Sequence, residues 1–141
     1  MQLKITMILI LLFSVIGLAA DLTPKNVYLE CVQQGIKYPE IVTAQSIQET
    51  GWYKCDNCSL KYNNIFGFWS DGTYIKFNRW EESVEYYRDW QVKYYTSGRD
   101  YYNFLMCLYT TKEGRCVRYA ADPLYTVKVQ AIADKYASTW K

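Results

Sequence analysis

All three prolines of the chain stand where a helix can begin, and this restricts the fold more than any other feature. Pro24 follows a threonine that can cap a helix, Pro39 precedes an apolar run, and Pro123 follows an aspartate. Proline is well tolerated in the first turn because its missing N–H has no partner there. Gly35 and Gly51 are placed to end the first two of these helices. The sequence therefore predicts a mainly helical chain.

Apolar residues recur at helical spacing in five segments. The expected helices run from Pro24 to near Gly35, from Pro39 to Gly51, from Trp80 to Tyr95, from Asp100 to Tyr109, and from Asp122-Pro123 to Tyr136. Between them, Ile65–Trp69 and Thr73–Phe77 flank Ser70-Asp71-Gly72, which is typical of a β-hairpin with glycine where a positive φ is needed. A chain of 141 residues suits a single core. We expect a mainly α (α+β) fold: one helical domain, residues 21–141, with one small hairpin.

The composition excludes several functions. There is no histidine, so a Ser–His or Cys–His nucleophile pair and a His-ligated catalytic zinc cannot be built. Any hydrolase on this chain must use carboxylates, tyrosines or backbone groups. Fifteen tyrosines and five tryptophans suit the flat apolar faces of sugar rings, although tyrosine also packs cores. A net charge of only +2 argues against a nucleic-acid partner.

Residues 1–20 have the pattern of a signal peptide. Lys4 supplies the positive start, residues 5–18 form an apolar run, and residues 17–20 (GLAA) offer a small-residue cleavage site. A retained membrane anchor is the alternative, but the run is shorter than the roughly 20 residues that a membrane span prefers. We expect export to the periplasm or the extracellular space, with no membrane contact after cleavage.

The five cysteines would then lie in an oxidising compartment, where disulfides form. We favour structural bridges, above all Cys107–Cys116, with Cys31 free or exchanging partners. Cys55 and Cys58 form a C-x-x-C, so a zinc knuckle with the second pair and a redox motif are the competing interpretations. The eight residues between Cys107 and Cys116 are many for a zinc ligand pair, and no thioredoxin-like pattern surrounds the C-x-x-C.

Glu49 is the main candidate for catalysis. It falls in the last turn of the helix expected over 39–51, where its carboxylate would face the negative end of the helix dipole. Trp52, Tyr53 and the segment 66–69 add aromatic neighbours. A carboxyl group in such surroundings is costly to ionise, which predicts a raised pKa and suits a general acid. The alternative is a solvated residue at a helix end.

Four sequence blocks carry a resemblance to a known family. AQSIQETGW, NNIFGFW, an ESV-YY-W helix and RYAADPLYTVKVQAI follow one another in this order. Together they resemble the glucosaminidase domains of glycoside hydrolase family 73, which are bacterial peptidoglycan hydrolases with a lysozyme-like fold. The match runs from about Lys25 to Tyr136, and the C-x-x-C before NNIFGF is similar to that of exported forms from Bacteroides-type bacteria.

The resemblance implies roles for particular residues. Glu49 corresponds to the general acid, and Asn64, Phe66 and Gly67 belong to a block that would line the glycan cleft. Tyr119 corresponds to a tyrosine that faces the substrate near the acid. Tyr125 belongs to the same block and would also contact substrate.

The second catalytic group has three candidates. Family members often have another acid in or after the hairpin, and Asp71, Glu81 and Glu82 are the candidates here. Each also has a structural explanation, because aspartate is favoured in turns and acids are favoured at helix starts. Alternatively the 2-acetamido oxygen of the substrate attacks C1 itself, so that Glu49 alone is indispensable. Tyr119 or an asparagine would then orient the acetamido group.

The aromatic residues near the hairpin have two possible roles, sugar stacking or core packing. We expect Phe66 in the core and Trp69 in the cleft, and Trp52 is a further candidate for sugar binding. The predicted activity is that of a monomeric endo-β-N-acetylglucosaminidase on peptidoglycan strands, with no metal or other cofactor. The alternatives are a lytic transglycosylase and a non-catalytic glycan-binding module on the same scaffold.

Overall fold

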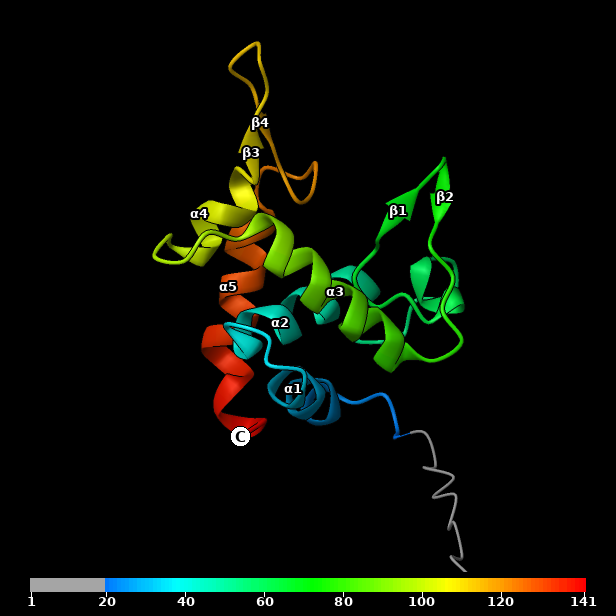
Figure 1. Cartoon of the computed structure of the whole chain (residues 1–141). Helices are drawn as coiled ribbons and strands as arrows, with labels where there is room; N and C mark the ends of the chain where they lie inside the picture. Colours follow the sequence, from blue (N-terminus) through cyan, green and yellow to red (C-terminus); the bar gives the residue numbers. More distant parts are fainter. Residues whose placement is uncertain (1–19) are drawn as a thin grey trace, which may run out of the picture.

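The computed structural model describes residues 20–141, which form a helical body with two small hairpins (Figure 1). The α-helices are α1 (Pro24–Gln33), α2 (Pro39–Thr50), α3 (Trp80–Tyr94), α4 (Tyr101–Met106) and α5 (Tyr125–Tyr136), and the short 3₁₀ turns are η1 (Ser59–Tyr62) and η2 (Ala137–Thr139). The mainly α fold predicted from the sequence is confirmed. The predicted signal peptide lies outside the described residues except for Ala20.

The predicted helix starts and ends are largely confirmed. The Thr23 side chain accepts the Asn26 N–H at 3.2 Å and caps α1. Gly51 ends α2 in the left-handed region, with φ of 55°, and donates its N–H to Ile47. The last helix begins two residues later than expected, because Asp122 forms a turn of its own and accepts the Leu124 N–H at 2.9 Å.

Helix α2 is the centre of the core. It packs mainly against α5 and α1, and residues on nearly all of its faces are buried, including the polar Thr43, Gln45 and Ser46. Val42 belongs to an apolar cluster shared with α1, α3 and α4, whereas Ile47 belongs to a second cluster shared with α5. The polar side chains of α2 therefore have to find hydrogen-bond partners inside the protein.

The predicted hairpin is present but short. Strand β1 (Trp69–Ser70) pairs antiparallel with β2 (Thr73–Tyr74), and the intervening Asp71 and Gly72 both have positive φ, as a two-residue hairpin turn requires. Next to β1 and β2, the Ile75 N–H donates to the Phe68 carbonyl at 3.0 Å, and the buried Asn64 holds the same two segments. Its amide donates to the carbonyls of Phe68 (2.8 Å) and Ile75 (3.0 Å).

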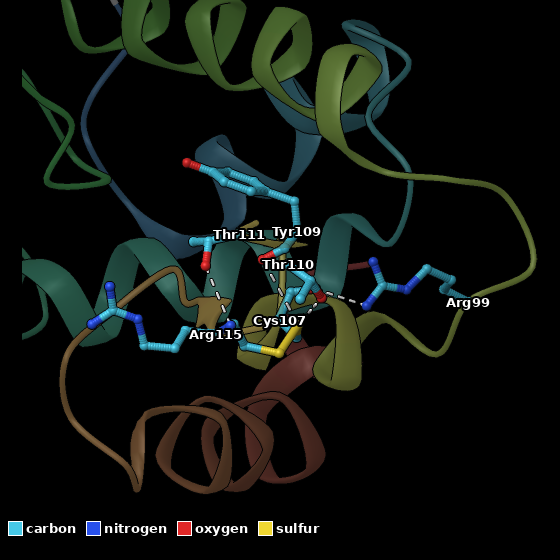
Figure 2. The surroundings of a disulfide bond; sticks show 7 residues. Arg99, Cys107, Tyr109, Thr110, Thr111 and Arg115 are labelled. Atoms are coloured by element: carbon cyan, nitrogen blue, oxygen red, sulfur yellow. Dashed lines mark hydrogen bonds between the residues drawn. A yellow bond between two sulfur atoms is a disulfide. The ribbon is translucent and has the colours of Figure 1, made fainter. Parts of the chain in front are cut away.

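A second hairpin was not predicted. Strand β3 (Tyr109–Thr110) pairs with β4 (Cys116–Val117), so the helix expected to reach Tyr109 ends at Met106. The Cys107–Cys116 disulfide ties the hairpin to the end of α4. Arg99 donates to the Cys107 carbonyl at 2.7 Å (Figure 2). The sequence had favoured the disulfide but not the strands, because two-residue strands have too little alternation to be read as a pattern.

The cysteine predictions can be compared directly with the structure. The favoured Cys107–Cys116 bridge is confirmed, Cys55 and Cys58 form a second disulfide, and Cys31 is free and buried. These two bridges leave no thiolate among those four cysteines for a zinc knuckle. Over residues 20–141, no helix is long and apolar enough to cross a membrane.

Candidate active site

A cavity of about 350 Å³ lies between the two hairpins. Both hairpins project from the same side of the helical body, and Figure 1 shows α3 running between their bases. The lining residues are Glu49, Phe66, Gly67, Phe68, Trp69, Trp90, Leu108, Tyr119 and Ala120. Among the described residues, Glu49 is the only carboxylate that lines this cavity. The volume falls within the range of ligand sites, and the walls are mostly aromatic.

Glu49 projects from the last turn of α2 into this cavity. Burial raises the pKa of its carboxyl group to about 7, while a hydrogen bond from Tyr125 opposes the rise. The carboxyl also lies at the carbonyl end of the helix, where negative charge is disfavoured. The raised pKa expected from the sequence is therefore found, and a substantial fraction of Glu49 is protonated at neutral pH.

Gly67 fits closely against the acid. Its φ is +71°, and a Cβ atom at this position would lie 2.8 Å from Glu49 Oε2. Any side chain would therefore collide with the carboxyl group, and the backbone conformation itself also favours glycine. The loop before β1 approaches Glu49 by its bare backbone.

Tyr119, which follows β4 in the sequence, contacts the same loop. Its hydroxyl donates to the Phe66 carbonyl at 2.8 Å, and its ring stacks on that of Tyr125 with centroids 5.5 Å apart. Burial raises the pKa of the Tyr119 hydroxyl well above its ordinary value, so this group stays protonated. It fixes the position of the peptide that precedes Gly67.

The aromatic walls divide into packed and exposed rings. Phe66 is 1% exposed and belongs to the core, whereas Trp69 is 60% exposed and stands against Tyr74 in an edge-on contact. Both placements were expected. Trp90, on α3, completes the wall and meets the Tyr119 ring edge-on at 5.3 Å. An exposed indole next to a buried acid is a suitable surface for a sugar ring.

A protein-family model matches nearly all of the described residues. The family model for glucosaminidases, described as mannosyl-glycoprotein endo-β-N-acetylglucosaminidase, matches residues 25–138.

The chain belongs to the glucosaminidase family.

The resemblance to glycoside hydrolase family 73 is thereby confirmed, while the likeness to exported Bacteroides-type forms stays a prediction. Membership of a glycosidase family makes this a glycan-binding hydrolase domain. No curated protein and no solved structure matched the chain.

Other residues predicted for the glucosaminidase site lie outside the cavity lining. Trp52 packs edge-on against Tyr136 with ring centroids 4.8 Å apart. Asn64 is fully buried and holds the loop before β1, and Tyr125 is buried behind Glu49. These two residues support the cavity from below its surface, and a direct contact with substrate stays a prediction for all three.

None of the three candidates for the second acid belongs to the cavity lining. Glu82 accepts the Asn78 N–H at 2.8 Å at the start of α3. Asp71 is exposed in the β1–β2 turn, and Glu81 is buried in the first turn of α3, where its Oε2 has no hydrogen-bond partner in the described part of the chain. Their catalytic role remains a prediction.

Four residues of this cavity were not among the predicted site residues: Phe68, Trp90, Leu108 and Ala120. Trp90 was assigned to helix packing, because an aromatic stripe at helical spacing gives no sign of which ring reaches a cavity. Leu108 was placed inside an expected helix, but it lies just before β3 and donates its N–H to Val117 at 2.7 Å. The only available signal was the spacing of Cys107 and Cys116, which is compatible with a hairpin closed by a disulfide.

Proposed function

We propose that the protein cleaves peptidoglycan strands at the β-1,4 bond after N-acetylglucosamine, as an endo-β-N-acetylglucosaminidase with Glu49 as general acid. The observation that supports this most is a carboxyl group with a pKa near 7 in an aromatic-walled cavity. A general acid works best when its pKa lies close to the working pH. Family membership supports the glycosidic bond as the target.

The presence of one cavity carboxylate among the described residues favours substrate assistance. Glu49 protonates the glycosidic oxygen while the substrate's 2-acetamido oxygen attacks C1, so the leaving strand departs and an oxazolinium ion forms. Water then attacks C1 and Glu49 accepts its proton. The ring reopens to the acetamido group, and the acid is restored. An inverting or double-displacement route would need a second carboxylate facing Glu49.

Tyr119 is proposed to orient the acetamido group. Its hydroxyl proton is directed to the Phe66 carbonyl, so its oxygen is free to accept a hydrogen bond. Accepting the acetamido N–H would hold the carbonyl oxygen of that group toward C1 and increase its electron density. Trp69 and Phe68 would stack on the sugar rings on either side of the scissile bond.

Glu49→Gln tests the role of the acid, because it keeps the side-chain shape and removes the proton to be donated. We expect wall-digesting activity to fall by about 10²–10⁴-fold, the usual contribution of a general acid, while binding to purified peptidoglycan is retained. Unchanged activity would contradict the proposed role of Glu49. If the wild-type protein binds but releases no fragments, the chain is the non-catalytic glycan-binding module.

Mass spectrometry of the released fragments separates the two enzyme reactions. Reducing N-acetylglucosamine ends support the proposed hydrolase. Anhydro-muramoyl ends would instead identify a lytic transglycosylase, in which a hydroxyl of the sugar itself replaces water.

De-N-acetylated peptidoglycan tests substrate assistance. Removing the acetyl groups deletes the proposed nucleophile, so these strands should bind but resist cleavage, and re-acetylation with acetic anhydride should restore cleavage. Cleavage of the de-N-acetylated strands at the rate of the untreated wall would point to an enzyme carboxylate, and Glu81→Gln and Asp71→Asn would then identify it.

Export and a monomeric state are further parts of the proposal. Two disulfides support an oxidising compartment. N-terminal sequencing of the protein recovered from culture medium or periplasm would test cleavage near residue 20, and light scattering would test the monomer.

A further inference from the structure

Behind the cavity, a line of buried polar side chains crosses the core from α3 to α2. It begins at Gln91, whose amide bonds to both peptide groups of Lys37. The Lys37 N–H donates to Gln91 Oε1 at 2.8 Å, and Gln91 Nε2 donates to the Lys37 carbonyl at 2.9 Å. A backbone N–H can only donate and a backbone carbonyl can only accept, so these two bonds settle which end of the Gln91 amide is which.

The fixed amide determines the direction of the next bonds. Gln91 Nε2 also donates to the Tyr101 hydroxyl at 2.9 Å, and the Tyr101 and Tyr87 hydroxyl oxygens are 2.6 Å apart. Because Tyr101 already accepts from Gln91, its single proton is available for Tyr87. Tyr87 then directs its own proton to Gln45 Oε1, at 2.5 Å.

The last links reach the acid. With its oxygen accepting from Tyr87, the Gln45 amide presents Nε2 to the Tyr125 hydroxyl, at 3.2 Å. Tyr125 therefore accepts from Gln45, so its own proton is left for another acceptor. The interaction of Tyr125 with the Glu49 carboxyl group lowers the pKa of Glu49 and raises that of Tyr125, which is the effect of a hydrogen bond donated by Tyr125. Tyr87 and Tyr101 both belong to the core, at 0% and 2% exposure, and Gln45 is fully buried, so bulk water does not compete for these bonds.

We propose that this chain of hydrogen bonds, oriented by the Lys37 peptide groups, makes Gln45 and Tyr87 positioning residues that hold Tyr125 as a donor to Glu49. The orientation from Lys37 to Tyr125 stands on its own hydrogen-bond geometry, the donation to Glu49 is the inference drawn from it, and only the effect on turnover rests on the proposed function. A donor fixed on one carboxyl oxygen leaves the acidic proton to the other oxygen, which is the arrangement a general acid needs to face a glycosidic oxygen.

Neutron diffraction on the wild-type protein tests the orientation directly. We expect a deuteron on Tyr125 Oη directed at Glu49, one on Tyr87 Oη directed at Gln45, and both deuterons of the Gln45 amide on the atom nearest Tyr125. A Tyr125 deuteron directed at Gln45 would overturn the proposal. This measurement uses no substrate. Its result is therefore independent of whether the protein cleaves peptidoglycan.

Tyr87→Phe tests the consequence for the acid. Without the Tyr87 donor, the Gln45 amide can turn its oxygen to Tyr125, which then donates there and no longer to Glu49. The pKa of Glu49, followed by the carboxyl infrared band or by carbon-13 NMR, should rise toward the value in Tyr125→Phe. We expect a rise of up to about one pH unit, as for loss of one hydrogen bond to a charged group.

Tyr53→Phe is the matched control. The Tyr53 hydroxyl bonds to Ser46 of the same helix at 2.7 Å and takes no part in the chain. The Tyr53→Phe change should lower the melting temperature about as much as Tyr87→Phe does and leave the pKa of Glu49 at its wild-type value. Equal pKa values of Glu49 in Tyr87→Phe and Tyr53→Phe would overturn the proposal, and if Tyr87→Phe does not fold, the neutron experiment decides.

Discussion

Gly67 and Glu49 are in direct contact: a methyl group added to Gly67 would lie 2.8 Å from Glu49 Oε2. Tyr119 anchors the preceding peptide by its bond to the Phe66 carbonyl. Phe66 and Tyr119 are 53 positions apart in the sequence, yet together with Gly67 they fix the surface that the acid meets. The loop before β1 is therefore part of the environment that sets the properties of Glu49.

The contact predicts a specific effect of Gly67→Ala. The positive φ should cost about 1–2 kcal/mol of stability, and the collision should displace the Glu49 carboxyl group and lower kcat/KM by about tenfold or more. Gly35→Ala is the control, because Gly35 has nearly the same φ, +72°, with no atom within 4 Å of the added methyl group. It should show the same loss in urea unfolding and full activity; equal activity in both variants would contradict this account.

The rate should depend on pH through Glu49. A general acid acts in its protonated form, and the pKa of Glu49 is about 7. We therefore expect kcat/KM to fall as the pH rises through about 7 and to be retained below it, in measurements with a soluble glycan fragment from pH 4.5 to 9. A rate that stays constant through pH 9 would mean that Glu49 does not donate a proton in the limiting step.

Stability should respond to the same group with a definite sign. The pKa of Glu49 is raised from 4.5 in the unfolded chain to about 7 in the folded protein, so the folded state binds more protons between these values. The contribution of Glu49 to the free energy of unfolding is then fully present below about pH 4.5 and is lost as the pH rises through about 7. Glu49→Gln should be more stable than wild type at pH 8, by about 1–3 kcal/mol, and show no such gain at pH 4.

Urea unfolding at the two pH values measures this difference. Glu30→Gln on α1 is the control, because it is the same substitution at a glutamate outside the cavity lining. The Glu30 side chain accepts from Gln34 at the helix surface. The Glu30→Gln change should give no pH-dependent gain of comparable size. An equal gain for Glu49→Gln at pH 4 and pH 8 would show that packing, and not ionisation, is responsible.

Trp69 and Trp52 should have separable roles. Trp69 lines the cavity and is 60% exposed, whereas Trp52 is 40% exposed and packs on Tyr136. We expect Trp69→Ala to raise KM by about tenfold, as for one lost stacking contact, with little change in stability. Trp52→Ala should lower the melting temperature and leave KM unchanged. The reverse pattern would identify Trp52, and not Trp69, as the sugar-binding residue.

The Cys107–Cys116 disulfide should support the cavity wall that contains Leu108. Replacing both cysteines by serine should lower stability by about 2–3 kcal/mol, as expected for a short closed loop, and should raise KM. The double serine variant at Cys55 and Cys58 is the control, since that bridge closes a shorter loop away from the cavity lining. Differential scanning calorimetry and KM of the two variants give the comparison.

Much of the fold could be predicted because its signals are local. Thr23 and Pro24 begin α1, Pro39 and Gly51 delimit α2, and Asp71-Gly72 forms the hairpin turn. In each case the conformational preference belongs to the residue itself or to its immediate neighbours. The second hairpin escaped prediction because its strands are only two residues long and are held by a disulfide.

The site could be predicted only in part. Glu49, Gly67 and Tyr119 are found at the cavity where the resemblance had placed them, and Trp69 is exposed beside it. The candidates Asp71, Glu81 and Trp52 do not contribute to its lining. The sequence could not show this, because a position in a turn or helix does not indicate which part of the surface becomes concave.

The sequence by itself determined where the helices and the first hairpin form, the absence of histidine chemistry, and the position of one acid at a helix end. Only the tertiary structure decided how deeply that acid is buried, which rings face it, and the direction of the hydrogen bonds behind it. Gln45 and Tyr87 are 42 positions apart in the sequence, and neither has a local preference for the other. Their contact exists because α2 is enclosed by the surrounding helices, and a buried polar group must find its partner among whatever side chains that enclosure brings near.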